Sequence, residues 1–199
     1  MPTVASSAYA CVSVTELPAR SWLSRVRSVL AVIDLQNVFA DPASPWFTPR
    51  FAEVVPPIRR LVSAFGNDVV FTRFVAPSRP EGAWKQYYEQ WPFALQSPDA
   101  QLYQVINAFQ PPSTVDATTF GKWTRMATRV GGAGLVLAGV STDCCVLSTA
   151  LAAADAGVSV TVVSDACAGV DDESHAKALD LMRLYGPLVK VATTDEVLG

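Results

Sequence analysis

Three short stretches of the sequence place polar and reactive side chains directly after apolar runs. They are Asp34-Leu35-Gln36-Asn37, Thr72-Arg73 and Ser141-Thr142-Asp143-Cys144-Cys145. If the apolar runs are parallel strands, these residues lie at the carboxyl ends of the strands, where such sheets bind their ligands. A thiol and a carboxylate brought together there could act as a nucleophile and a general base.

Cys145 is the most informative of these residues. It follows the apolar run Leu135–Val140 and precedes an alanine-rich stretch that ends at Gly157. At the start of a helix, the helix dipole lowers a thiol pKa and unpaired N–H groups can bind a developing oxyanion. The alternative is that Cys145 is only a small buried apolar residue.

Asp34 is the second candidate, because it lies near the end of the apolar run Val29–Leu35, where an ionised carboxylate needs partners. It could orient or deprotonate a thiol, or it could cap a helix or bind a neighbouring loop. Gln36, in the same stretch, is a candidate for binding substrate. Arg73 could bind a substrate carboxylate or pair with a structural acid.

The segments that must position these residues predict an α/β fold. Apolar runs alternate with stretches of helical periodicity, which is typical of a three-layer, doubly wound, mostly parallel sheet flanked by helices. Strands are predicted at 29–35, 68–74, 114–118, 135–140, 158–163 and 189–192, and helices at 122–130, 142–156 and 171–185. A further helix ends at Gly66-Asn67, and Pro56 and Pro57 suit its first turn.

Residues 76–112 show no clear period, and a stretch of this length is more often a lid or binding loop than an idle connection. This segment contains Trp84 and Trp91, while Trp46 lies in the turn-rich stretch after the first strand. These tryptophans are predicted either to wall a substrate pocket or to pack between subunits.

Composition narrows the classes of protein that the chain can be. Its 199 residues are 50% hydrophobic and 17% charged, with a net charge of −3, so we expect one globular domain, residues 28–199, after an N-terminal leader, residues 1–27. Lys and Arg form no cluster that could follow a nucleic acid, and no apolar run approaches the ~20 residues that span a membrane. The leader lacks the pattern of a signal peptide. The four cysteines have neither disulfide nor metal spacing, which favours the cytoplasm.

Two strings resemble the isochorismatase-like cysteine hydrolases. Ala31–Phe39 (AVIDLQNVF) is similar to the first strand of that family with its D-x-Q-x-x-F ending, and Gly139–Val146 (GVSTDCCV), followed by Thr149-Ala150, is similar to its nucleophile turn. The resemblance extends from residue 28 to the C-terminus. It implies a doubly wound homo-oligomer, a dimer or tetramer, that hydrolyses amide-type C–N bonds through an Asp–Lys–Cys triad and a thioester.

Carried over residue by residue, the resemblance places the nucleophile at Cys145 and the acid/base at Asp34. It also implies a cis peptide bond between Val140 and Ser141, with the N–H groups of Ser141 and Cys145 forming an oxyanion hole. The family's lysine column holds Ala117 here, so the triad lysine is expected at Lys122 or, as a weaker substitute, at Lys85. If neither lysine reaches Cys145, the helix dipole alone must activate the thiol.

No metal or other cofactor is predicted. Nicotinamidases of the same superfamily bind a zinc-type ion through an Asp and two His, whereas this chain has one histidine, His175. The predicted function is hydrolysis of an amide, imide or ureido bond in a small molecule. The alternatives are a vinyl-ether hydrolase of the isochorismate-cleaving branch, against which Cys145 argues, and a non-catalytic binding or redox-sensing protein of the same fold.

Overall fold

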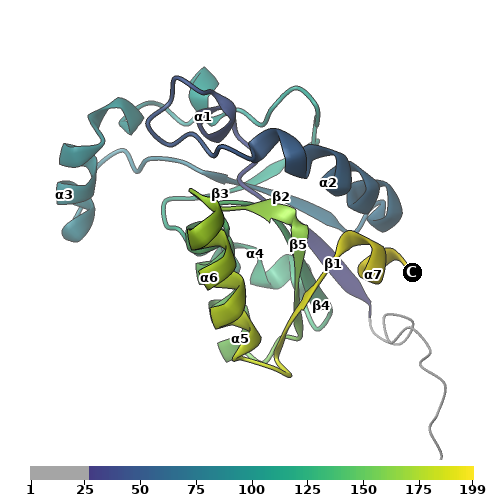
Figure 1. Cartoon of the computed structure of the whole chain (residues 1–199). Coiled ribbons are helices and arrows are strands. Elements are labelled where there is room, and N and C mark those ends of the chain that lie inside the picture. The colour runs from purple at the N-terminus through teal and green to yellow at the C-terminus, as the bar shows by residue number, and fades with distance from the viewer. Residues whose placement is uncertain (1–26) are drawn as a thin grey trace, which may run out of the picture.

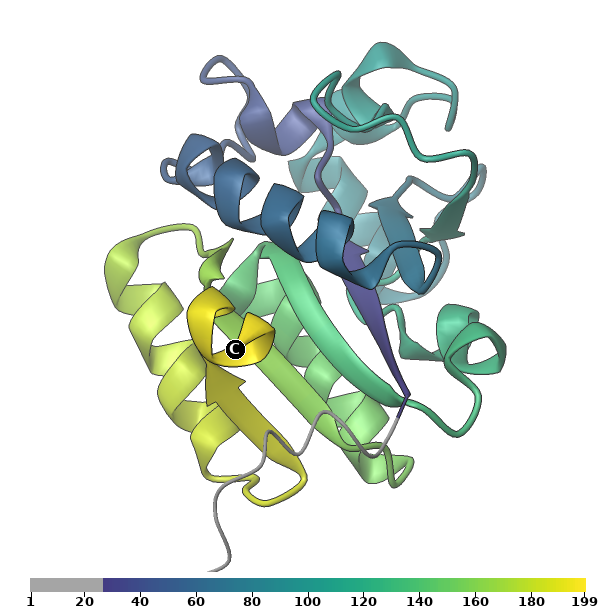
Figure 2. The ribbon, with the colours of Figure 1, turned by 90° about the vertical axis from the view of Figure 1, so that its right-hand side faces the viewer.

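The structure is a computed structural model that describes residues 27–199 as a six-stranded sheet with helices on both faces (Figures 1 and 2). The strand order is β3-β2-β1-β4-β5-β6, and every neighbouring pair is parallel. The predicted three-layer, doubly wound α/β fold is therefore confirmed. The predicted leader lies outside the described residues apart from Arg27.

The elements follow one another in an alternating order. The strands are β1 (Ser28–Ile33), β2 (Val69–Phe74), β3 (Thr114–Ala117), β4 (Gly134–Val140), β5 (Val160–Ala168) and β6 (Val189–Ala192). The α-helices are α1 (Asn37–Ala40), α2 (Phe51–Phe65), α3 (Ala83–Gln90), α4 (Trp123–Val130), α5 (Leu147–Asp155), α6 (Asp172–Arg183) and α7 (Thr194–Leu198). Two 3-10 turns, Pro92–Ala94 and Gln101–Tyr103, follow α3, and a π-helical turn, η4 (Thr142–Val146), precedes α5.

The sheet is buried on both faces, which explains why its strands are continuous apolar runs. Along β1, Leu30 and Val32 join the core under α2 and α7, while Ala31 and Ile33 join the core under α4, α5 and α6. Figure 1 shows these two groups of helices on opposite sides of the sheet. Successive side chains of a strand point to opposite faces, so each strand contributes to both cores.

The start of α2 differs from the sequence prediction. The helix begins at Phe51, so Pro56 and Pro57 lie in its interior and not in its first turn. Phe51 and Val54 are buried in the core, and their burial extends the helix toward its N-terminus. The two prolines have no N–H group to donate to the carbonyls four residues earlier, but those residues are exposed to solvent, where water can serve as donor.

The segment 76–112, predicted as irregular, contains α3 and both 3-10 turns. Helix α3 is largely polar and exposed, and only its aromatic side chains turn inward, so it has little apolar periodicity. Figure 1 shows α1 and α3 beyond one end of the sheet. In addition, β5 continues to Ala168, five residues past its predicted end, and α7 was not predicted.

The central strands β1 and β4 form the topological switch point of the sheet. The chain leaves β1 toward the α2 face and leaves β4 toward the α5 face, which opens a crevice between the two strand ends. Gly139 permits close pairing here, since its φ is +119° and a Cβ atom would lie 2.1 Å from the Ile33 carbonyl oxygen. Asp34 and Ser141 directly follow these paired ends.

Candidate active site

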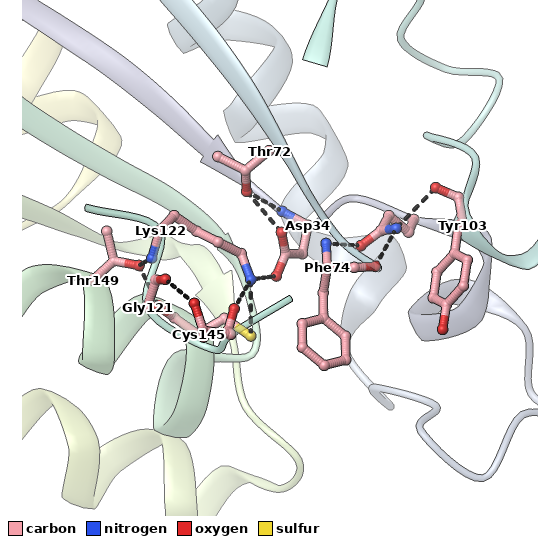
Figure 3. Close-up of polar contacts among 10 residues, drawn as sticks. Asp34, Thr72, Phe74, Tyr103, Gly121, Lys122, Cys145 and Thr149 are labelled. Atoms are coloured by element: carbon pink, nitrogen blue, oxygen red, sulfur yellow. Dashed lines mark hydrogen bonds and ion pairs between the residues drawn. The ribbon is translucent and has the colours of Figure 1, made fainter. Parts of the chain in front are cut away.

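A buried ion pair forms the floor of the crevice (Figure 3). The Lys122 Nζ lies 2.9 Å from the Asp34 Oδ2, and both side chains have an exposed fraction of 0%. Burial lowers the pKa of the Lys122 ammonium, but the charge of Asp34 and its hydrogen bond to Lys122 outweigh this effect, so the pKa is raised overall. Lys122 therefore stays charged at neutral pH although it is fully buried.

The same ammonium faces the Cys145 thiol. Lys122 Nζ lies 3.9 Å from Cys145 Sγ and also donates a hydrogen bond of 2.9 Å to the Thr119 carbonyl oxygen. The structure thus brings Asp34, Lys122 and Cys145 together, as the resemblance implied. Lys85, the weaker substitute, is exposed on α3.

Two threonines hold these groups in place. The Thr72 hydroxyl, near the end of β2, donates a 2.7 Å hydrogen bond to Asp34 Oδ1 and accepts one from the Asp34 N–H. The Thr149 hydroxyl accepts a 2.9 Å hydrogen bond from the Lys122 N–H and donates one of 2.6 Å to the Cys145 carbonyl oxygen. Thr149 thereby links the start of α4 to the turn that carries Cys145, as Figure 3 shows.

Cys144 and Cys145 are coupled through their side chains. A hydrogen bond with Cys144 and burial raise the pKa of the Cys145 thiol, while the Lys122 ammonium lowers it. The hydrogen bond from Cys145 lowers the pKa of Cys144, although burial opposes this shift. The direction of this shift favours the protonated form of the Cys145 thiol. The third thiol, Cys167, is separate, and burial raises its pKa to about 12.

The turn that carries Cys145 is fixed to the loop before α6. The peptide bond between Val140 and Ser141 is cis. Asp143 accepts a 2.5 Å hydrogen bond from the Ser141 hydroxyl and a 2.9 Å hydrogen bond from the Val170 N–H. Asp143 consequently ties the turn to its neighbouring loop.

A cavity of about 250 Å³ opens above Cys145. Cys144, Cys145 and Ser141 lie in its lining, and most of the remaining wall is apolar. The other lining residues are Phe39, Pro45, Trp46, Phe47, Thr48, Phe74, Tyr87, Trp91, Phe120 and Val170. The cavity places the thiol where a small molecule can reach it, although only 3% of Cys145 is exposed.

Trp46 and Trp91 line the cavity as predicted, but three other candidates for substrate binding do not. Trp84 packs behind the wall, with its ring centroid 5.0 Å from that of Phe120. Arg73 forms a two-point ion pair with Asp116 on the adjacent strand, at 2.8 and 2.5 Å, and so takes the structural alternative left open by the sequence.

Gln36 is fully buried, and its amide forms hydrogen bonds with backbone groups. It donates hydrogen bonds to the carbonyl oxygens of Phe74 (3.0 Å) and Tyr103 (2.8 Å), and it accepts one from the Phe74 N–H (2.8 Å). These bonds leave no amide group facing the cavity. The expectation that Gln36 binds substrate is therefore wrong. Its side chain instead joins three segments of the chain, those that contain Gln36, Phe74 and Tyr103.

No group of three or more His, Cys, Asp or Glu side chains within residues 27–199 is placed to hold a metal ion. His175 lies on α6, where its Nδ1 is 2.9 Å from the Thr142 hydroxyl, and burial lowers its pKa. None of the helices in the same range has the length and apolarity of a membrane span.

Comparison with known families decides the identity of the fold. The sequence profile of the Isochorismatase domain matches residues 28–196. The chain belongs to this hydrolase family. The matched range contains all three residues of the Asp34–Lys122–Cys145 site.

Solved structures similar to this isochorismatase-family protein support the assignment of the fold. A cysteine hydrolase from Pseudomonas syringae pv. phaseolicola 1448A aligns with a TM-score of 0.76 at 21% identity, over 92% of this chain and 94% of that one. The N-carbamoylsarcosine amidase of Thermoplasma acidophilum aligns at 0.67 and 22%, over 87% and 99%. The zinc complex of Pyrococcus horikoshii pyrazinamidase aligns at 0.68 and 19%, over 84% and 99%. No curated protein sequence gave a significant match.

The sequence reasoning missed several residues of this isochorismatase-family site. Thr149 was quoted only as part of a motif, although its spacing of four residues from Cys145 places both on one face of the helix. Phe74 and Phe120 complete the wall and were not singled out. Both could have been predicted from their positions near Thr72-Arg73 and Lys122, because the chain reaches the carboxyl edge of the sheet at these two places.

Proposed function

We propose that the protein is a cysteine hydrolase that cleaves the C–N bond of a small amide, imide or ureido compound. One observation carries this proposal: the Lys122 ammonium lies 2.9 Å from the Asp34 carboxylate and 3.9 Å from the Cys145 thiol. A base, a cation and a nucleophile thus meet under a cavity that admits a small molecule. The proposal also includes homo-oligomerisation, which the resemblance implies, and a cytoplasmic location without a cofactor, which the cysteine spacing and the single histidine favour.

The acylation half of the reaction starts with transfer of the Cys145 proton to Asp34. The nearby Lys122 ammonium stabilises the thiolate that forms. The thiolate attacks the substrate carbonyl, and the N–H groups of Ser141 and Cys145 stabilise the tetrahedral oxyanion. Asp34 then gives its proton to the leaving nitrogen, the C–N bond breaks and a thioester remains on Cys145.

Deacylation reverses these roles with water as the nucleophile. Asp34, again ionised, accepts a proton from a water molecule that attacks the thioester carbonyl. The C–S bond breaks, the proton returns to the Cys145 sulfur, and the carboxylic acid product leaves. Lys122 stays protonated throughout, because its pKa is raised by the charges around it.

The cavity argues against the vinyl-ether alternative. Isochorismate carries two carboxylates, and no residue lining the cavity within the described part of the chain is basic. A dianion placed there would lose its hydration without gaining an ion pair with the wall. The amide reaction needs only a neutral carbonyl next to the thiol.

The two adjacent thiols provide the test. With a panel of small amides, Cys145→Ala is expected to lower kcat by about 10³-fold or more, because the nucleophile is removed. Cys144→Ala, the matched control, is expected to keep most of the activity. Intact-protein mass spectrometry after rapid quenching is expected to find an acyl adduct on Cys145. If the two variants have equal activity, Cys145 is not the nucleophile.

A further inference from the structure

The walls above Cys145 are rich in aromatic side chains and have no charge of their own. We infer that the substrate is an electrically neutral amide whose acyl group is small and apolar, a single ring or a short branched chain. This inference rests on the proposed hydrolysis and adds the chemical class of the substrate.

Trp46 is at the centre of the apolar wall. Its ring centroid lies 6.2 Å from Phe39, 5.7 Å from Phe74, 6.0 Å from Tyr87 and 6.2 Å from Trp91. Side chains that pack against one another in this way present ring faces and edges to a ligand and no unpaired charge. An apolar acyl group gains from burial against such a wall.

An anionic substrate finds no partner in this wall. Arg73, the cation nearest in sequence to Phe74, is already engaged by both carboxylate oxygens of Asp116. The charge of Lys122 is balanced by Asp34 below the cavity. A carboxylate or sulfonate on the acyl group would therefore lose its hydration without compensation.

A cationic substrate is also disfavoured. Aromatic faces attract cations, but the Lys122 ammonium already lies 5.0 Å from the centroid of Phe74. A cationic group in the cavity would therefore share this ring with Lys122, and it would find no acidic residue among the lining side chains. The preferred substrate thus carries neither sign of charge.

The size of the cavity limits the acyl group. A volume of about 250 Å³ lies just below the range of roughly 300–1,000 Å³ that is typical of sites for drug-sized ligands. One aromatic ring or a branched chain of a few carbons fits this space together with the amide.

The test uses three primary amides of matched shape and different charge. They are 3,3-dimethylbutanamide (neutral), trimethylammonioacetamide (cationic) and sulfoacetamide (anionic), which differ only in the group attached to the CH₂–CONH₂ unit. For the wild-type protein, we expect kcat/KM for the neutral amide to exceed each of the other two by about 10²-fold. Equal or faster turnover of either charged amide would overturn the inference and leave the proposed hydrolysis standing.

Binding to Cys145→Ala, measured by calorimetry, separates the two proposals. If no amide is hydrolysed by the wild type but the neutral one binds most tightly, the hydrolysis fails and the preference of the cavity stands. Absence of binding by the neutral amide, or tighter binding of a charged one, overturns the preference.

A charged side chain introduced at the mouth of the cavity provides a second test of the inference. Val170 lines the cavity and has an exposed fraction of 53%, so Val170→Lys introduces a cation without burying it. We expect this variant to raise kcat/KM for sulfoacetamide relative to the neutral amide by about tenfold. Leu95→Lys is the matched control, because Leu95 is 46% exposed and lies outside the cavity lining. This variant is expected to leave kcat/KM unchanged for both amides. An unchanged ratio in Val170→Lys would contradict the inference.

Discussion

The Asp34–Lys122 ion pair is sealed from solvent, and its two members depend on each other. Lys122→Met keeps most of the side-chain volume but leaves the Asp34 carboxylate buried without its cation. We expect this change to lower the free energy of unfolding by about 3–5 kcal/mol, because removal of one partner leaves an uncompensated buried charge. Urea denaturation followed by circular dichroism measures the loss.

The double variant Asp34→Asn/Lys122→Met is the control for this prediction. It removes both charges, so most of the lost stability is expected to return while hydrolysis stays absent. If Lys122→Met is as stable as the wild type, the pair does not make the electrostatic contribution assigned to it here.

The thiol of Cys144 controls the acidity of its neighbour. In the wild type, the hydrogen bond with Cys144 is the largest cause that raises the pKa of Cys145. Cys144→Ala removes this bond, so the pKa of Cys145 is expected to fall and its alkylation by iodoacetamide to begin at lower pH. Site-resolved mass spectrometry between pH 5 and 10, a range that brackets the ordinary thiol pKa of ~8.5, measures both profiles.

Lys122→Met gives the opposite sign in the same experiment. The ammonium lowers the pKa of Cys145, so its removal is expected to move the alkylation profile to higher pH. If the alkylation profile of Cys145 also moves to higher pH in Cys144→Ala, then Cys144 does not raise the pKa of Cys145 and the prediction is wrong.

At the scale of elements, the contact between β1 and β4 decides the geometry of the site. Gly139→Ala would place a Cβ atom 2.1 Å from the Ile33 carbonyl oxygen at a φ of +119°, so the two strands must separate. We expect a loss of several kcal/mol in the free energy of unfolding and loss of activity, since Asp34 and Ser141 follow these strands.

Gly132→Ala is the matched control for the strand contact. No atom lies within 4 Å of its added Cβ, and the residue is outside the left-handed region. Its melting temperature and activity are expected to stay close to those of the wild type. A similar loss in both variants would mean that the close approach at Gly139 is not the cause.

The elements differ in how well the sequence predicts them. Strands β1, β2, β4 and β6 were predicted within one or two residues, because strands buried on both faces are continuous apolar runs. Helix α3 was not predicted because its inward face is aromatic and its other faces are polar. The early start of α2 depends on burial of Phe51 and Val54, a tertiary effect that outweighs the usual position of proline.

At the scale of the whole molecule, the positions of Asp34 and Cys145 at one edge of the sheet were predictable from the sequence, and the cavity was not. Asp34 and Cys145 follow predicted strands, so topology alone brings them to one edge of the sheet. Lys122 was ambiguous because its approach depends on side-chain reach and on Thr149, 27 residues away. The wall combines residues from segments between Phe39 and Val170, and sequence periodicity does not report such long-range contacts.

The distribution of metal-binding side chains leads to a prediction for the whole chain. Within residues 27–199 no three such groups converge, and the single histidine of the sequence contacts Thr142. Activity toward amides is therefore expected to be unchanged after dialysis against a chelator, as measured by initial rates. A large loss that zinc restores would contradict this expectation.

Gln36 shows how much depends on the identity of one atom. Its Nε2 faces two carbonyl oxygens and its Oε1 faces one N–H, so these hydrogen bonds form in one orientation of the amide only. Gln36→Glu would keep the shape but place a carboxyl oxygen against those carbonyls, where it must carry a proton to bond. Burial would raise the pKa of the new acid above its unfolded value of ~4.3, so the folded state would bind the extra proton and lose stability as the pH rises. The neutral amide at position 36 thus makes the joint between sheet and cavity wall independent of pH.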